Sequence, residues 1–148
     1  MTIDAATTAS LGDRYHGGGT ARFAHGLLVI ASPDSTDDHA GWDPAREPVH
    51  AGPDSLYVGV RQSASGPVAV ACLEEPAPHG ALDVLFRGEI TLARASIALY
   101  DPHGQLRLER PVERDLNRIT LYGDDPDEPA EIVVVLGVPD EKRSPRQP

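Results

Sequence analysis

Cysteine is almost absent from this sequence, since Cys72 is the only one in the chain. A single cysteine excludes an intramolecular disulfide and the cysteine-rich class of zinc site. Long apolar runs are also missing, and none approaches the roughly 20 residues that span a bilayer. The first residues, MTIDAATTAS, have no basic start and no apolar stretch of signal-peptide length. We therefore expect a cytoplasmic protein that does not enter a membrane.

Basic residues are in short supply. The chain has 13 Lys and Arg against 23 Asp and Glu, which gives a formal net charge of −10. Nucleic acids and anionic membrane surfaces are bound through basic side chains, so the composition disfavours both as direct partners. It favours a basic protein partner, because opposite fields steer an encounter. The alternative is that the acidity serves solubility alone.

Glycine and proline are abundant, with 14 of each. Helix interiors tolerate both residues poorly, whereas short strands joined by turns accommodate them. The length fits one domain, and the apolar share of 40% is ordinary for a folded protein. The composition therefore favours a single β-rich domain.

Short apolar runs separated by turn residues occupy the middle of the chain, and several alternate with a period of two. The runs are Leu27–Ile30, Leu56–Val60, Val68–Cys72, Leu82–Leu92, Ile97–Leu99, Leu106–Leu108, Ile119–Leu121 and Ile132–Leu136. They predict an all-β fold, an antiparallel β-sandwich or flattened barrel of about 8–9 short strands with little or no helix. Ser65-Gly66-Pro67 is typical of a hairpin turn, and residues 111–118 are the best helical segment, short enough to be only a turn.

Both ends of the chain lack a pattern that faces a core. Residues 1–22 are small and polar and contain Gly17-Gly18-Gly19, so we expect a flexible N-terminal arm. Residues 140–148 are expected to form a flexible tail. Residues 23–139 then make up the single sandwich domain, with Cys72 facing its core.

Two acidic segments interrupt the strand pattern. Residues 31–54 hold six carboxylates against one arginine and have the only tryptophan, Trp42, near their middle, while residues 123–131 hold five carboxylates and no basic residue. Loops of this length are usually functional, and tryptophan is enriched at interaction surfaces. Alternatively, Trp42 folds back over the end of the sandwich, with its N–H bonded to a carbonyl. The candidate partner-binding residues are Asp34, Asp37, Asp38, Trp42, Asp43, Asp124, Asp125, Asp127 and Glu128.

Motifs for catalysis and for metal binding are missing. The sequence contains no G-x-S-x-G, H-E-x-x-H or EF-hand pattern, and Gly17-Gly18-Gly19 lacks the lysine of a phosphate loop. The six histidines are scattered, mostly beside turn signals, and are expected to be exposed. Four arginines at positions 107, 110, 114 and 118 are interleaved with acids, which predicts a salt-bridged solvated face. We predict no catalytic residue, no metal site and no cofactor.

One family shares the order of these features. The chain begins this order with an apolar strand (Leu27–Ile30) and an acidic loop that holds a lone tryptophan (Gly41-Trp42-Asp43). Next come Ala51-Gly52-Pro53-Asp54 before an alternating strand, and then Leu85-Phe86 ahead of Gly88. In this order the sequence resembles the small acidic β-sandwich inhibitors of DNA-entry nuclease, of the competence protein J type. Leu85 stands where that family has a proline, and the loop at 124–128 has no counterpart there. The resemblance implies a protein without catalytic residues that inhibits a basic, nucleic-acid-binding enzyme stoichiometrically through an acidic surface.

These observations predict a non-enzymatic protein-interaction domain, an inhibitor or immunity-type partner of a basic enzyme such as a nuclease. Three alternatives stay open. A small-molecule or carbohydrate-binding β-domain would have an apolar pocket lined by Tyr57, Phe86, Tyr100 or Tyr122. A structural subunit of a larger assembly would use an exposed edge strand, and a homo-oligomer is compatible with either reading. A hydrolase or metal-dependent enzyme would need histidines and carboxylates converging in a cleft.

Overall fold

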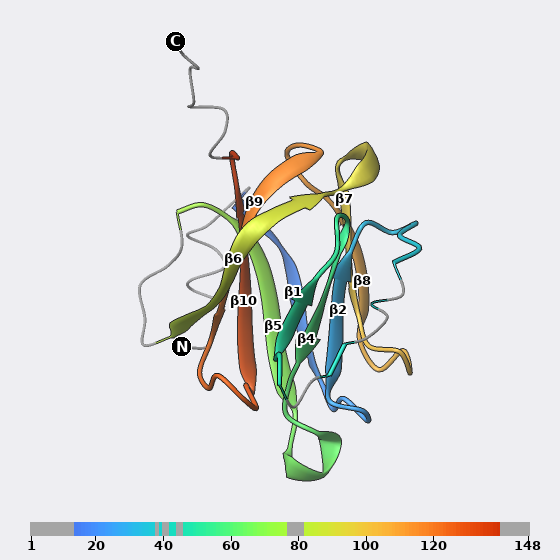
Figure 1. Ribbon diagram of the computed structural model, residues 1–148, viewed down its shortest axis with the longest axis vertical. Helices are drawn as coiled ribbons and strands as arrows, with labels where there is room; N and C mark the ends of the chain where they lie inside the picture. The colour runs from blue at the N-terminus through green and yellow to red at the C-terminus, as the bar shows by residue number, and fades with distance from the viewer. Residues whose placement is uncertain (1–13, 38, 40–41, 44–45, 77–81, 140–148) are drawn as a thin grey trace.

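Two β-sheets packed face to face form the protein, as the computed structural model shows (Figure 1). The structure describes residues 14–37, 39, 42–43, 46–76 and 82–139. The all-β sandwich predicted from the strand pattern is confirmed, and the sheets do not close into a barrel. Two single turns of 3-10 helix, Ser63–Ser65 and Ala93–Ala95, are the helical elements of the described residues.

Each sheet has five strands, so the described residues contain ten strands where the sequence predicted eight or nine. The first sheet, called sheet A here, has the order β1-β5-β10-β9-β6, and the second, sheet B, has the order β3-β4-β2-β7-β8. The strands are β1 (Tyr15–Ala21), β2 (Leu27–Ala31), β3 (Val49–Ala51), β4 (Ser55–Gly59), β5 (Val68–Glu74), β6 (Asp83–Thr91), β7 (Ser96–Tyr100), β8 (Arg107–Pro111), β9 (Leu116–Gly123) and β10 (Glu131–Gly137).

Strand β1 corrects the expectation of a flexible arm over residues 1–22. Tyr15–Ala21 pairs antiparallel with β5, and Gly18 lies opposite Ala71. A Cβ atom on Gly18 would lie 2.5 Å from the Val70 carbonyl oxygen, so the glycine permits a close approach of the two backbones. The expectation of a flexible arm therefore fails for residues 15–21. Its first thirteen residues, and the expected tail at 140–148, lie outside the described residues.

The turn at residues 65–67 does not close a hairpin, which corrects a second expectation. The strands on either side of it, β4 and β5, belong to different sheets, so the segment carries the chain from sheet B to sheet A. Strand β5 then pairs in parallel with β10, with Ala69 opposite Glu131. The sandwich is consequently antiparallel except at this one pair of its described strands.

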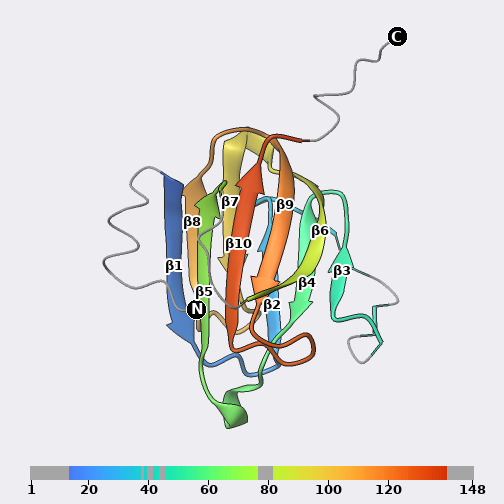
Figure 2. The same ribbon diagram turned by 90° about the vertical axis from the view of Figure 1, so that its left-hand side faces the viewer.

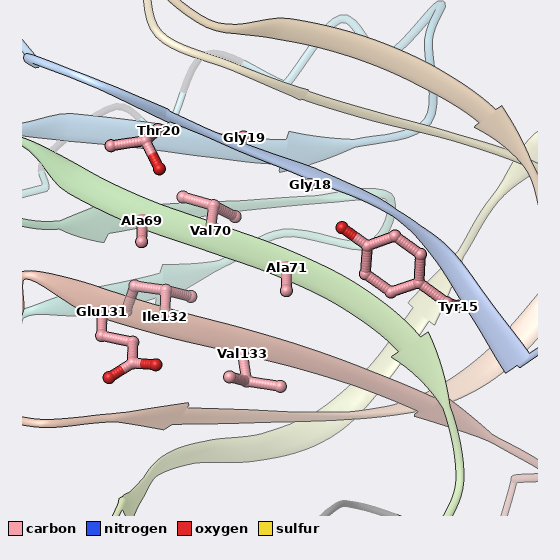
Figure 3. Close-up of a pocket in the computed structure, with 10 residues that line it drawn as sticks. All are labelled: Tyr15, Gly18, Gly19, Thr20, Ala69, Val70, Ala71, Glu131, Ile132 and Val133. Atoms are coloured by element: carbon pink, nitrogen blue, oxygen red, sulfur yellow. The ribbon is translucent and has the colours of Figure 1, made fainter. Parts of the chain in front are cut away.

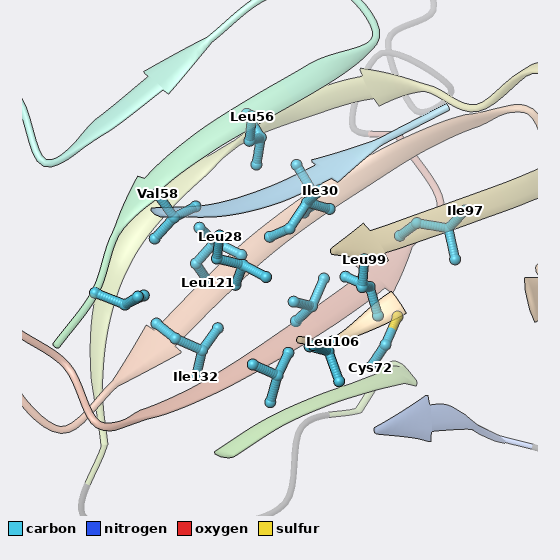
Figure 4. Close-up of a cluster of buried hydrophobic side chains, with 14 of the residues drawn as sticks. Leu28, Ile30, Leu56, Val58, Cys72, Ile97, Leu99, Leu106, Leu121 and Ile132 are labelled. Atoms are coloured by element: carbon cyan, nitrogen blue, oxygen red, sulfur yellow. The ribbon is translucent and has the colours of Figure 1, made fainter. Parts of the chain in front are cut away.

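The core lies between the two sheets and consists mainly of aliphatic side chains, with the buried Phe23 and one buried cysteine (Figure 4). Val70, Cys72 and Val134 reach it from sheet A, and Ile30 and Leu56 reach it from sheet B. Cys72 is fully buried, as the alternating pattern predicted. Burial, with a smaller contribution from the nearby Glu74, raises the pKa of its thiol, so the reactive thiolate is strongly disfavoured.

The two long sides of the sandwich differ (Figure 2). On one side β1 of sheet A packs beside β8 of sheet B, with the Arg110 side chain against Gly17 and Leu106 against Gly19. On the other side the edge strands β6 and β3 leave a hollow between the sheets. One side of the core is thus covered by main chain, and the other is open.

Ion pairs hold the start of β9 against the end of β5. Arg118 donates to both carboxylate oxygens of Glu75, at 2.6 and 2.9 Å, and Arg114 bonds to Glu74. The segment 111–118, the best helical candidate, instead joins the end of β8 to the start of β9. Of the predicted salt-bridged face, Arg107 does pair with Glu109. Arg114 and Arg118 pair instead with Glu74 and Glu75, at the end of β5.

Candidate partner-binding site

The end of β4 brings three loops together through main-chain hydrogen bonds. Arg61 N–H donates to the carbonyl of Pro129, in the second acidic segment, at 3.0 Å. Gly59 N–H donates to Pro48, at the end of the first acidic loop, at 2.8 Å. Val60 N–H donates to Gly26, between β1 and β2, at 2.9 Å. Both acidic segments therefore meet at the same end of the sandwich, although they are far apart in the sequence.

A hollow of about 540 Å³ lies where these loops meet, and we call it the acidic hollow. Trp42 lines it from the first acidic segment, and Asp127 and Glu128 line it from the second. His25 and Gly59 complete much of its wall. The structure thus places the only tryptophan of the chain and two carboxylates of the other loop around one space.

Trp42 is held in place on one side and open on the other. Its indole N–H donates to the Glu47 carbonyl at 2.6 Å, and its ring meets Tyr57 edge-on, with 5.5 Å between the centroids. The residue is half-buried. The side chain therefore folds back onto β4 with its N–H bonded to a carbonyl, as one of the two interpretations predicted, and it also lines the acidic hollow. Its role in recognition stays a prediction.

The four candidate acids of the second loop divide into two pairs. Asp124 accepts hydrogen bonds from the N–H groups of Ala130 and Glu131, and Asp125 accepts from those of Asp127 and Glu128. The bonds from Glu128 and Asp127 hold the pKa of Asp125 below its ordinary value. Asp124 and Asp125 thus shape the loop, and this shape places the side chains of Asp127 and Glu128 at the acidic hollow.

Two candidate acids of the first loop, Asp34 and Asp37, bond to other groups of the same chain. Asp34 accepts from Ser32 and pairs with Arg94, and these contacts lower its pKa. Asp37 accepts from the Ser55 hydroxyl at 2.9 Å. Asp43 is exposed next to Trp42, and Asp38 lies outside the described residues. The first loop therefore contributes Trp42 to the acidic hollow, while Asp34 and Asp37 hold the loop to the sandwich.

Sequence reasoning missed a buried polar chain under the first loop. His39 was expected to be exposed but is 8% exposed and stacks on Tyr57, with 3.8 Å between the ring centroids. Its Nε2 lies 2.6 Å from the hydroxyl of Ser55, and its Nδ1 lies 2.7 Å from Nδ1 of His50. The members come from a loop, from β3 and from β4, so no local spacing could have revealed the arrangement.

The aromatic pocket required by the small-molecule alternative is not formed by its four candidate residues. Tyr57 lies under His39, Tyr100 under Arg107, and Phe86 and Tyr122 line two different depressions. Over the described ranges, no three His, Cys, Asp or Glu side chains are grouped as metal ligands would be. No helix in the same ranges is long and apolar enough to cross a membrane.

A second hollow, of about 200 Å³, lies over β1, β5 and β10 (Figure 3). Its floor consists of small residues, among them Gly18, Ala69 and Ala71, and Tyr15 stands at one end. Glu131 also lines it. None of the candidate partner-binding residues does, whereas Trp42, Asp127 and Glu128 line the acidic hollow, which we take as the candidate site.

Comparison with known proteins gives a likeness of fold alone. No protein-family model matches the chain, and no curated protein sequence matches it. Among solved structures, ComJ from Bacillus subtilis, an inhibitor of the DNA-degrading activity of NucA, superposes with a TM-score of 0.68 at 7% identity, over 85% of this chain and 98% of its own. The product of crocagin biosynthetic gene J superposes with a TM-score of 0.48 at 11% identity, over 82% of this chain and 97% of its own. The resemblance to the competence protein J type is confirmed as a resemblance of structure: the chain has a fold similar to that of ComJ.

Proposed function

We propose that this chain is a non-enzymatic protein-binding domain that covers a basic site on an enzyme, with a nuclease as the preferred class. The observation that carries the proposal is the meeting of Trp42, Asp127 and Glu128 around one hollow. A tryptophan supplies rigid apolar contact area, and flanking carboxylates attract lysine and arginine. The fold shared with ComJ supports an inhibitor over the other kinds of binding protein.

The mechanism of such an inhibitor is occlusion. An enzyme that degrades DNA binds a polyanion and therefore presents a basic surface at its active site. The net charge of −10 raises the rate of encounter with that surface, and the acidic hollow then competes with the DNA backbone for it. No residue of the inhibitor has to take part in a chemical step.

The small-molecule or carbohydrate alternative has less support, because the aromatic side chains that it needs lie in separate places. The structural-subunit alternative would use β6 or β3, the edge strands on the open side of the sandwich. Neither alternative gives a reason for the meeting of the two acidic loops.

The test is a titration of the chain against the DNA-degrading activity of NucA and of nucleases captured on the immobilised wild-type chain. We expect stoichiometric inhibition that weakens with salt, and an inhibition constant at least about tenfold larger for Asp127→Asn/Glu128→Gln. Glu113→Gln/Asp115→Asn is the matched control, since both acids are exposed before β9 and the second acidic loop follows its other end. Equal inhibition by the two double variants would refute the proposed surface.

A further inference from the structure

The acidic hollow continues into an apolar groove on the open side of the sandwich, which we call the edge groove. Both spaces share Pro48 and Gly59 in their walls, and Pro126 of the edge groove directly precedes Asp127 and Glu128. The edge groove has a volume of about 270 Å³. Its other walls are β6, through Val84, Leu85 and Phe86, and the facing strands β3 and β4, through Val49 and Val58.

The apolar walls of this groove are accessible. Val84 is 47% exposed and is one of two large hydrophobic residues, among those described, that are exposed to this degree. Leu85 and Phe86 are half-buried and pack against the main core from its margin. The edge groove therefore gives access to the margin of the hydrophobic core. An apolar side chain placed in it would pack against Leu85 and Phe86.

The backbone of β6 is built to present these side chains. A register shift between Val84 and Phe86 leaves Leu85 as the extra residue of a bulge. The Leu85 side chain lies over Gly123, where a Cβ atom would be 2.5 Å from it, and Phe86 lies over Gly88, where a Cβ atom would be 2.8 Å away. Two glycines thus give both side chains the room to line the groove.

Charge surrounds the apolar groove. Exposed carboxylates stand next to its lining residues in the sequence: Asp83 precedes Val84, and Asp127 and Glu128 follow Pro126. Glu47 is exposed beside Pro48. Arg46 and Arg87 are the exposed cations nearest to them in the sequence, so the rim carries an excess of negative charge.

Strand β6 also offers a backbone edge. It stands at the end of sheet A and pairs only with β9 within that sheet. An extended segment can lie along such an edge with every second side chain directed into a groove and the others toward the rim. The apolar edge groove with its acidic rim fits a segment in which an apolar residue is flanked by lysine or arginine.

From this geometry we infer that the edge groove binds an extended basic segment of the partner and takes one large apolar side chain of that segment as an anchor. The inference rests on the proposed function and deepens it: the carboxylates of the acidic hollow select the charge of the partner, and the edge groove selects a residue next to that charge. Inhibition of a nuclease would then depend on two contacts that can be removed separately.

Val84 allows the edge groove to be tested apart from the acidic hollow. It lines the edge groove but not the acidic hollow and is 47% exposed, so Val84→Ser removes apolar wall at a position outside the core. Val138→Ser is the matched control, since Val138 is 51% exposed and lines neither space.

The experiment measures binding of short synthetic peptides by anisotropy and by emission from Trp42, the only tryptophan of the chain. The probes are a lysine-serine peptide with a central phenylalanine, the same peptide with a central serine, and a version with glutamate for lysine. We expect the phenylalanine peptide to bind at least about tenfold more tightly than the serine peptide, and the glutamate version not to bind. Val84→Ser should reduce the advantage of phenylalanine, and Val138→Ser should keep it.

An equal affinity of wild type for the phenylalanine and serine peptides would overturn the inference, as would an unchanged phenylalanine advantage in Val84→Ser. A concentration-dependent dimer that Val84→Ser dissociates would also overturn it, because a second copy would then be the occupant. Nuclease inhibition separates the anchor from the proposed function. Full inhibition by Val84→Ser leaves the proposed function standing without the anchor, whereas a phenylalanine preference without any inhibition removes the nuclease and keeps the edge groove as a binding site.

Discussion

Nδ1 of His39 lies 2.7 Å from Nδ1 of His50, so only one of these two nitrogens carries a proton. The Ser55 hydroxyl donates to Asp37 and therefore accepts from Nε2–H of His39, which fixes one end of the chain of bonds. In the neutral pair, Nδ1 of His39 therefore accepts from Nδ1–H of His50, and the bonds run in one direction from His50 through His39 and Ser55 to Asp37.

This relationship predicts that His50→Ala lowers the free energy of unfolding more than His50→Gln does, because the glutamine amide can still donate to Nδ1 of His39 and the methyl group of alanine cannot. Denaturant titrations at neutral pH, followed by Trp42 emission, measure both values. Equal losses in the two variants would contradict the pairing.

Asp37 should cause a loss of stability in acid. Burial opposes its ionisation, but hydrogen bonds, that from Ser55 foremost, hold its pKa below the ordinary value of 3.8. A lowered carboxyl pKa contributes stability above pH 3.8 that disappears as the pH falls through the native pKa. Denaturant titrations of wild type and Asp37→Asn from neutral pH into acid measure this loss, and a decrease of the same size in both proteins would contradict it.

Ser55→Ala should destabilise the protein by about 1–3 kcal/mol, since it removes the hydroxyl that bonds to both Asp37 and His39 at a residue only 2% exposed in the wild type. Urea unfolding gives the free energy directly. Ser65→Ala, at an exposed position, is the control and should change little. A loss no larger than that of the control would show that the chain of bonds from Asp37 to His50 does not hold the first loop.

Asp125→Ala should weaken nuclease inhibition although Asp125 is not part of the acidic hollow. Its carboxylate accepts from the N–H groups of Asp127 and Glu128, so its loss frees the two residues that face the partner. Asp125→Asn keeps an oxygen acceptor without the charge and should retain most of the inhibition. The inhibition constants of both variants, compared at one salt concentration, decide the point; equal constants for alanine and asparagine would mean that the charge of Asp125 matters and its bonds do not.

Gly18→Ala should lower the free energy of unfolding by about 1–3 kcal/mol, because the new methyl group would meet the backbone of β5 at Val70 and Ala71. Gly59→Ala adds the same methyl group where space is available and should be close to neutral. Thermal unfolding of the two variants side by side is sufficient. If both were neutral, β1 would not be fixed against β5 as closely as the structure indicates.

The strand pattern predicted most of sheet B and the core because one face of each strand is apolar. Leu56 and Val58 alternate with outward-facing residues and proved to be buried in β4. Strand β1 was not predicted, because Gly17, Gly18 and Gly19 have no side chains that could show an alternation of apolar and polar residues. The turn at residues 65–67 marked a true break, but turn chemistry does not say which strands pair on either side of it.

The sequence predicted some of the residues that line the candidate site, but not what each acidic residue does there. Trp42, Asp127 and Glu128 were among the candidates, and the structure brings them together. Asp125 looks the same in sequence as Asp127, yet it is bonded to the loop backbone. Such a division depends on which N–H groups a carboxylate meets, and this is settled only once the loop is closed by the Arg61–Pro129 hydrogen bond.

The parallel pairing of β5 with β10 has a consequence for biosynthesis. Sheet A receives its middle strand last, since β10 joins β5 to β9 and is the final strand of the described chain. Until β10 emerges from the ribosome, β5 has only β1 as a neighbour, and an open edge rich in valine and alanine faces other nascent chains. Sheet A can therefore not be completed before residues 131–137 are available, even though its other described strands precede them in the chain.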